Sequence, residues 1–300
     1  MISQAKSLKL VKIYLYICKI YDEDLKYHCQ RFSNNNKPEL TDQEIMTIYL
    51  YAINEEQRFK IKQIHRFAQD YLGSWFPNLG SYAAFNNRIN RLSGAFSHLS
   101  NSLISEFRPD DCLLEQSLLD SMPIIICSGK RSPKVAGELV DKSYCSTKNL
   151  WYHGLKLHAL NFRRLSKLPF PEQLLITPAS ENDLNVFKNA WSGIADRDFY
   201  GDKIYADKDF FNALKNQKNS KMYTPVKAVK GQSDNEKKFD RAFNDLFSRA
   251  VSQIRQPIES FFNWLIEKTD IQRASKVRST NGLLVHVFGK IAAAFIPLIF

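Results

Sequence analysis

Apolar residues recur at helical spacing through the first hundred residues of the chain. Residues 8–20 place apolar positions three or four apart with lysines between them, which predicts an amphipathic helix and not a signal peptide. Thr41 and Glu44 stand three apart before a second apolar face, which is the pattern of a capping box. Further helices are predicted over 60–72 and 96–107.

Ser81 is placed to cap a helix between these last two, and Arg88 and Arg91 project from it. Short helices with basic residues on the third are typical of helix-turn-helix packing, which would make residues 1–108 a DNA-binding region. A plain helical bundle with solvated arginines fits the same pattern.

From Cys112 the spacing of apolar residues changes to that of strands. Strands are predicted over 113–127, 151–162, 173–177 and 198–205, and helices over 184–194, 209–217 and 239–270. Strands come mostly first and helices later. We therefore expect residues 109–300 to form an α/β layer with a mixed sheet and flanking helices, preceded by the all-helical region.

The last 19 residues, 282–300, are apolar except for His286 and Lys290 and contain Pro297. A buried helix that closes the core and a membrane anchor both fit this composition. A lysine and a proline inside a membrane span are costly, so we expect a buried helix and no membrane partner.

The composition of the chain indicates which class of partner it is suited to bind. The 300 residues are 44% hydrophobic and carry a formal charge of +11, which favours a polyanion, nucleic acid first, as the partner. The five cysteines include no C-x-x-C pair, which fits a reduced, cytoplasmic setting, with nucleoid association when DNA is bound.

The basic excess lies mainly in residues 127–169, which hold 9 Lys/Arg against 2 Asp/Glu, whereas residues 1–110 hold 14 against 11. Aromatic residues interleave with these cations, a mixture that suits phosphate neutralisation and base stacking. A solvated loop between strands is the alternative. The expected DNA contacts in this segment are Lys130, Arg131, Lys134, Lys148 and Lys156.

Three acidic residues stand out. Asp120 interrupts an apolar strand, where a carboxylate is costly to bury unless a salt bridge or a bound cation compensates. Asp202 follows a glycine at a predicted strand end, where α/β sheets hold ligands. Asp196, Asp198 and Asp207 compete with Asp202 for that role.

Glu259 lies on the polar edge of a predicted helix, one turn after Arg255. A local ion pair between the two explains this spacing, and so does a helix that packs on the sheet and directs Glu259 at its rim.

In this order, the three acids resemble the catalytic DDE set of insertion-sequence transposases with a ribonuclease H-like fold, and the chain is most similar to the IS982 family within the IS4-like group. The matching blocks are Leu119–Pro123 with Cys127, Trp151–His158, Leu175–Asp183, Gly201–Tyr205 and Arg255–Phe262.

The resemblance implies that Asp120, Asp202 and Glu259 hold two Mg²⁺ ions, with Mn²⁺ as a substitute, for cleavage at terminal inverted repeats and transfer of 3′ ends to target DNA. It implies a homodimer that pairs the two element ends. Asp183 matches a recurrent family acid outside the catalytic set, and Arg255 an arginine that contacts a DNA phosphate. Lys203 and Lys268 complete the expected DNA contacts.

The match departs from the family at two positions near Glu259. Ser252 stands where IS4-type enzymes carry a tyrosine, and Ile266 stands where they carry a lysine, with Lys268 two places later. A decayed or repurposed transposase that only binds DNA is therefore the alternative function.

Overall fold

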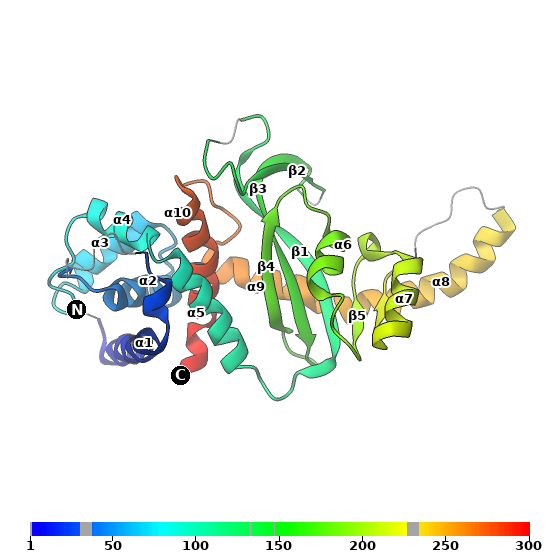
Figure 1. The fold of residues 1–300 in the computed structure, drawn as a ribbon, viewed down its shortest axis with the longest axis horizontal. Coiled ribbons are helices and arrows are strands. Elements are labelled where there is room, and N and C mark those ends of the chain that lie inside the picture. The colour runs from blue at the N-terminus through cyan, green and yellow to red at the C-terminus, as the bar shows by residue number, and fades with distance from the viewer. Residues whose placement is uncertain (1, 31–37, 132–133, 147, 227–233) are drawn as a thin grey trace.

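The computed structural model describes residues 2–30, 38–131, 134–146, 148–226 and 234–300. Figure 1 shows the N-terminal helices at one end of the molecule and the sheet in the middle. The C-terminal helix lies between the N-terminal helices and the sheet. The N-terminal helices are α1 (Gln4–Glu23), the 3-10 turn η1 (Leu25–His28), α2 (Asp42–Glu56), α3 (Ile61–Tyr71), α4 (Tyr82–Asn90) and α5 (Ser93–Glu106).

The two helix caps predicted in this region, at Thr41 and Ser81, are confirmed. The Thr41 hydroxyl accepts from the Glu44 N–H, and the Glu44 carboxylate accepts from the Thr41 N–H, which completes the capping box of α2. The Ser81 hydroxyl accepts from the Ala84 N–H and begins α4. These local bonds satisfy backbone donors that a helix start leaves without partners.

The sheet is mixed and curls around its central strands. Its strands are β1 (Leu113–Ser128), β2 (Asp141–Cys145), β3 (Leu150–Arg163), β4 (Phe170–Pro178), β5 (Asp198–Tyr200) and β6 (Lys221–Tyr223). β3 pairs antiparallel with β1 on one edge, and with β2 and then β4 on the other. β5 pairs parallel with β1, and β6 pairs parallel with β5.

β1 has a separate apolar core on each face. Leu118 and Met122 join the larger core, which also holds α9 (Pro257–Thr269) and the C-terminal helix. Leu119 joins a smaller core with Phe187 and Phe199. The helical elements on that side are α6 (Asp183–Val186), the π-helical turn η2 (Phe187–Trp191), the 3-10 turn η3 (Lys203–Tyr205) and α7 (Lys208–Lys218).

The single helix predicted over 239–270 is wrong. Two helices cover this range, α8 (Asp234–Arg255) and α9, and Gln256 separates them. Pro257 is the first residue of α9, where its missing N–H costs nothing. Inside one continuous helix the same proline would remove a hydrogen bond, so the chain restarts there.

The strand predicted over 198–205 is also too long, since β5 ends at Tyr200 and residues 203–205 form η3. β2 and β6 are strands that the apolar pattern did not predict. Both are short, and each is held by pairing with a longer or more central neighbour. Hydrogen-bonded pairing with a neighbouring strand defines β2 and β6, and an alternation of apolar and polar residues does not.

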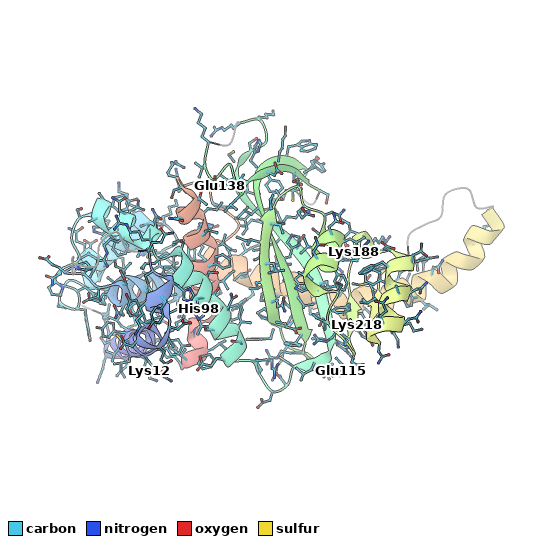
Figure 2. The ribbon with its side chains drawn as sticks, in the orientation of Figure 1. Lys12, His98, Glu115, Glu138, Lys188 and Lys218 are labelled. Carbon is cyan, nitrogen blue, oxygen red and sulfur yellow. The ribbon has the colours of Figure 1, made fainter. Side chains whose placement is uncertain are left out.

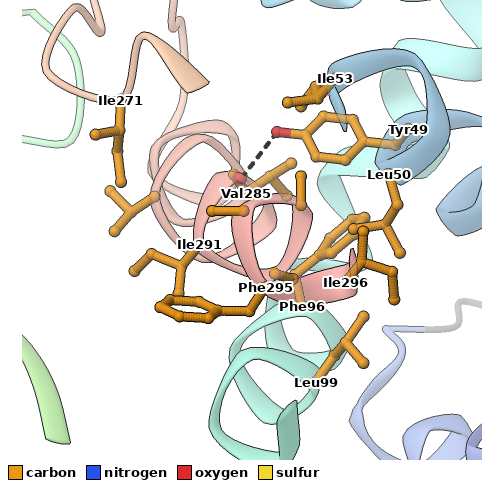
Figure 3. Close-up of a cluster of buried hydrophobic side chains, with 14 of the residues drawn as sticks. Tyr49, Leu50, Ile53, Phe96, Leu99, Ile271, Val285, Ile291, Phe295 and Ile296 are labelled. Atoms are coloured by element: carbon orange, nitrogen blue, oxygen red, sulfur yellow. Dashed lines mark hydrogen bonds between the residues drawn. The ribbon is translucent and has the colours of Figure 1, made fainter. Parts of the chain in front are cut away.

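The C-terminal segment joins the N-terminal helices to the sheet. It consists of α10 (Thr280–Leu284), the π-helical turn η4 (Val285–Gly289), α11 (Lys290–Phe295) and the 3-10 turn η5 (Ile296–Ile299). The Tyr49 hydroxyl of α2 donates to the Val285 carbonyl at 3.3 Å, as Figure 3 shows. Phe295 packs on Phe170 of β4 and on Trp264 of α9. One apolar core therefore runs through both regions, and the boundary at 108/109 stays a prediction.

Of the described helices, the one over 280–299 is long and apolar enough to cross a membrane by length and composition, with a mean hydropathy of 1.9. Most of that span, 61%, is buried inside the protein, as in a core helix.

Two titratable groups are buried on this helix. Burial lowers the pKa of Lys290 to about 7, although the nearby Asp270 carboxylate opposes this effect. Its ammonium donates to the Asp270 carbonyl at 3.0 Å. Burial, with Lys290 nearby, also lowers the pKa of His286 to about 3, so this ring is neutral and donates from Nε2 to the Ile271 carbonyl.

We predict that Lys290→Met stabilises the protein near neutral pH. The folded-state pKa of about 7 lies below the ordinary 10.5, so the penalty is complete below pH 7 and disappears as pH rises toward 10.5. Net of the lost hydrogen bond, the gain should be on the order of 2 kcal/mol near pH 6. Denaturant unfolding near pH 6 and near pH 9.5 measures it.

The matched control is Lys268→Met on exposed α9 surface, which should change little at either pH. An equal effect of Lys290→Met at both pH values would contradict the assigned charge penalty.

Candidate active site

Parallel pairing of β1 with β5 brings two aspartates together. The register pairs Leu118 with Tyr200, and Asp120 and Asp202 lie two residues further along the two neighbouring chains. Asp202 leaves the sheet and caps η3, where its Oδ1 accepts from the Ile204 N–H at 2.8 Å. Two carboxylates therefore meet at the carboxyl end of β5.

Gly201 explains why a glycine precedes Asp202. A Cβ at this position would lie 2.6 Å from the Tyr205 ring, closer than real Cβ atoms come to other atoms. The absent side chain lets Tyr205 fold back against the strand end and bury its ring completely. Its hydroxyl has no hydrogen-bond partner among the described residues.

Arg255 connects Asp120 to Glu259. Its Nη1 donates to Asp120 Oδ2 at 2.8 Å, and its Nη2 donates to Glu259 Oε1 at 2.6 Å. Arg255 ends α8, and Glu259 lies in the first turn of α9. Both alternatives considered for Glu259 are present together, since the local ion pair forms and the helix also directs Glu259 toward β1.

The surroundings of Asp120 disfavour the charged form of its carboxyl group. Burial raises the pKa of its carboxyl to about 6, while Arg255 and the Ser121 N–H lower it and the charges of Asp202 and Asp183 raise it further. The single Arg255 guanidinium is bonded to two carboxylates, Asp120 and Glu259, while the charges of Asp202 and Asp183 also act on Asp120. A bound cation would relieve this excess negative charge.

The donor set fits Mg²⁺. Asp120, Asp202 and Glu259, the acidic triad, offer only carboxylate oxygens, the ligands that hard divalent cations prefer. Within the described residues, the triad's oxygens do not all lie within 4.8 Å of one another. Arg255 lies between Asp120 and Glu259, so its guanidinium balances part of their negative charge at the position between them.

Asp183 lies on the other face of β1 and is already satisfied. It accepts from the Ser121 hydroxyl at 2.9 Å and from the Lys156 ammonium at 3.0 Å, and it is buried. His158 lies beside it, and burial lowers the pKa of that ring to about 4. These bonds give Asp183 a structural role that differs from the exposed position of Glu259.

A groove of about 510 Å³ opens beside Glu259 and Arg255. Lys203 and Arg249 contribute two further positive charges to its wall. Sequence analysis missed Arg249. Its signal was the helical spacing of Asp245, Arg249 and Ser252, which places all three on one polar face of α8.

The predicted DNA contacts fall into two groups. Those with exposed side chains are Lys130, Arg131, Lys134, Lys203 and Lys268. Lys268 lies at the far end of α9 from Glu259, about 14 Å along the helix axis.

The second group makes hydrogen bonds within the protein, although Lys148 is also exposed. Arg88 donates to the Leu40 carbonyl and to Asp42, Lys148 to Gln272, and Lys156 to Asp183. Arg91 is half-buried, and its carbonyl accepts from the Gln30 N–H. For Arg88, Lys148 and Lys156, a DNA contact stays a prediction that requires an existing side-chain bond to open, and for Arg91 it stays a prediction.

Comparison with known proteins gives one family. The family model described as the transposase DDE domain matches residues 114–296, which is more than half of the chain and contains the whole acidic triad. No curated protein and no solved structure matches the chain.

We predict that Arg255→Gln raises the pKa of Asp120 above about 6 in the metal-free protein. The variant removes the charge that lowers this pKa, whereas burial and Asp202 remain. Carboxyl ¹³C NMR titration measures it, with Asp120→Asn used to assign the signal. Arg255→Lys, which keeps the charge, should give a smaller rise.

Arg249→Gln is the matched control, since it removes a positive charge from the same groove and spares the bond to Asp120. A pKa of Asp120 that stays constant or falls in Arg255→Gln would show that the guanidinium does not compensate this carboxylate.

Proposed function

Because the chain belongs to the transposase DDE domain family, we propose that it cleaves DNA strands at the ends of an insertion element and transfers the freed 3′ ends to target DNA. One observation carries the proposal. A strand-borne aspartate, Asp120, lies beside a second aspartate at the end of the parallel neighbour strand, and Arg255 links it to a glutamate on a packed helix.

The sheet supports a ribonuclease H-like fold for residues 109–300. Pairing gives the order β4-β3-β1-β5-β6, in which β3 is antiparallel to its neighbours and β5 and β6 run parallel to β1. We include this fold, and the IS982 family, in the proposal.

The acidic triad would hold two Mg²⁺ ions, with Mn²⁺ as a substitute. Bound ions supply activation of the attacking water or 3′-hydroxyl and stabilisation of the leaving oxygen. The chain's own residues do the rest. Asp120 and Asp202 provide oxygens from the rigid sheet, and Glu259 provides one from α9, so the positions of both elements define where the scissile phosphate must lie.

Arg255 would change partners during the reaction. In the structure it neutralises Asp120 and Glu259, which compensates the buried carboxylate in the absence of a cation. Once cations take over that role, the guanidinium is free to bind a DNA phosphate with two parallel hydrogen bonds. Lys203 and Arg249 line the groove beside it and would hold the same strand.

A second DNA-binding surface would lie around β2 and β3. The exposed Tyr144 and Trp151 rings pack 5.4 Å apart between centroids, and the Lys142 ammonium lies 5.5 Å from the Trp151 centroid. Exposed aromatic rings with neighbouring cations suit stacking on unpaired bases. In the proposal, the N-terminal helices recognise the terminal inverted repeats, and a homodimer pairs the two ends.

We predict that Asp120→Asn, Asp202→Asn and Glu259→Gln each reduce Mg²⁺-dependent cleavage of DNA carrying the native element ends by more than about 100-fold. Each variant replaces a charged ligand with a neutral amide of the same size. The measurement is single-turnover strand cleavage with end-labelled DNA. Asp209→Asn, an exposed acid in the first turn of α7, is the matched control and should cleave normally.

Full activity in any one of the three variants would remove that residue from the catalytic set. A wild-type chain that binds the ends and never cleaves them would favour the alternative, a transposase that only binds DNA.

We also predict that Lys130→Ala/Arg131→Ala/Lys134→Ala weakens DNA binding and lowers its salt dependence. Each lost phosphate contact should reduce the slope of log K against log salt concentration by about 0.9. Fluorescence anisotropy over a salt series measures the slope. Arg164→Ala/Lys167→Ala is the control, because these two cations of the same segment are both paired with Asp111. Equal slopes for the wild type and the triple variant would show that these exposed cations do not contact DNA.

A further inference from the structure

A second cluster of metal-ligand side chains lies among the N-terminal helices. Asp24 follows the last residue of α1, His28 ends η1, and His98 lies on α5 (Figure 2). His98 Nε2 is 2.5 Å from Asp24 Oδ2, and His28 Nε2 is 3.5 Å from Asp24 Oδ1. The ligand atoms of these three side chains all lie within 4.8 Å of one another, and in the described part of the chain no other group of three or more His, Cys, Asp or Glu side chains does so.

The backbone builds this cluster from three elements. Asp24 and His28 are four residues apart across the end of α1 and η1, which brings both side chains to one side. Gly94 lies one turn before His98 on α5, and a Cβ there would lie 2.7 Å from the His28 carbonyl oxygen. The glycine therefore lets η1 approach α5 closely enough for the two rings to stack.

The two imidazole rings share one carboxylate. Their centroids are 4.4 Å apart and their planes differ by 15°, so both Nε2 atoms face Asp24 from stacked rings. A divalent cation bound by both Nε2 lone pairs and the carboxylate would use all three groups at once.

We propose that Asp24, His28 and His98 bind one divalent transition-metal ion of the zinc class. Two imidazole nitrogens and one carboxylate oxygen suit Zn²⁺, Co²⁺ or Ni²⁺, whereas Mg²⁺ prefers oxygen ligands alone. The site has an open position for water, since it provides three protein ligands.

The surroundings favour entry of a cation. The three side chains are between 36% and 46% exposed, so an ion reaches them from solvent. Asp22 and Glu23 precede Asp24 and are exposed, which adds negative charge at the approach.

The bound ion would hold α1 and η1 against α5. Helix α5 is followed, after the connection over residues 107–112, by β1, the strand that carries Asp120. The ion would therefore fix the first N-terminal helix to the element that leads into the sheet, and it would do so without taking part in the reaction at the acidic triad.

The test is metal binding to the untagged full-length chain after chelator treatment. Co²⁺ is the probe, because its visible absorption reports nitrogen ligands, and Zn²⁺ competition gives the affinity. We expect one site per chain that is at least tenfold weaker in His98→Gln and in Asp24→Asn. Asp22→Asn is the matched control and should bind as the wild type does.

The imidazole nitrogens identify the site independently of affinity. Long-range ¹H–¹⁵N NMR should show Zn²⁺-dependent shifts at Nε2 of His28 and His98, and none at His65, whose Nε2 lies 3.0 Å from the Gly80 carbonyl. Binding that survives in His98→Gln and disappears in Asp120→Asn would assign the ion to the acidic triad and overturn the proposal. Absence of any Co²⁺ or Zn²⁺ binding would overturn it as well and leave a hydrogen-bonded His–Asp cluster.

Discussion

A carboxylate in the middle of a strand costs free energy to bury, and the arrangement around β1 follows from how Asp120 is compensated. The compensating group is Arg255, 135 residues away on the last turn of α8. Its second nitrogen bonds Glu259, so one guanidinium positions the end of α8 and the start of α9 against the strand. Arg255 and Glu259 are four residues apart, a spacing that brings both side chains to one side of the chain across the junction at Gln256.

The bridge through Arg255 also bears on how the acidic triad would bind a cation. The guanidinium occupies the position between Asp120 and Glu259, although the triad itself offers only carboxylate oxygens, the ligands that such a cation prefers. A paired charge costs less than an unpaired one, yet the pKa of Asp120 stays raised because one guanidinium does not offset the burial and the neighbouring acids. The site therefore gains more from a divalent cation than an exposed acidic cluster would. Pairing of Arg255 with Asp120 and Glu259 would compete with binding of a cation by the same carboxylates, so in the proposed reaction a cation that enters the site would free the arginine for DNA.

Local features of the fold could be predicted from the sequence, and long-range ones could not. The Thr41–Glu44 capping box and the Ser81 cap depend on residues three apart, and both are confirmed. The partners of Arg88 and Lys156 depend on tertiary packing, so residues chosen for their charge proved to be engaged with Asp42 and Asp183. β2 and β6 escaped prediction for the same reason, since pairing with a neighbour defines them. The positions of the three acids in the chain indicated the candidate site, and the bridge through Arg255 needed the structure.

Charge counted along the chain and charge available on the surface differ in this protein. Segment 127–169 holds nine basic residues, but Arg164 and Lys167 pair with Asp111, Lys156 pairs with Asp183, and Arg163 donates to Gln116. The cations that remain exposed lie toward the β2 end of the sheet, and those of the groove, Lys203 and Arg249, come from η3 and α8. A DNA strand that follows the exposed charge would therefore contact elements far apart in sequence, β2 and its neighbouring turns as well as η3 and α8, because the cations free to neutralise phosphates are divided between them.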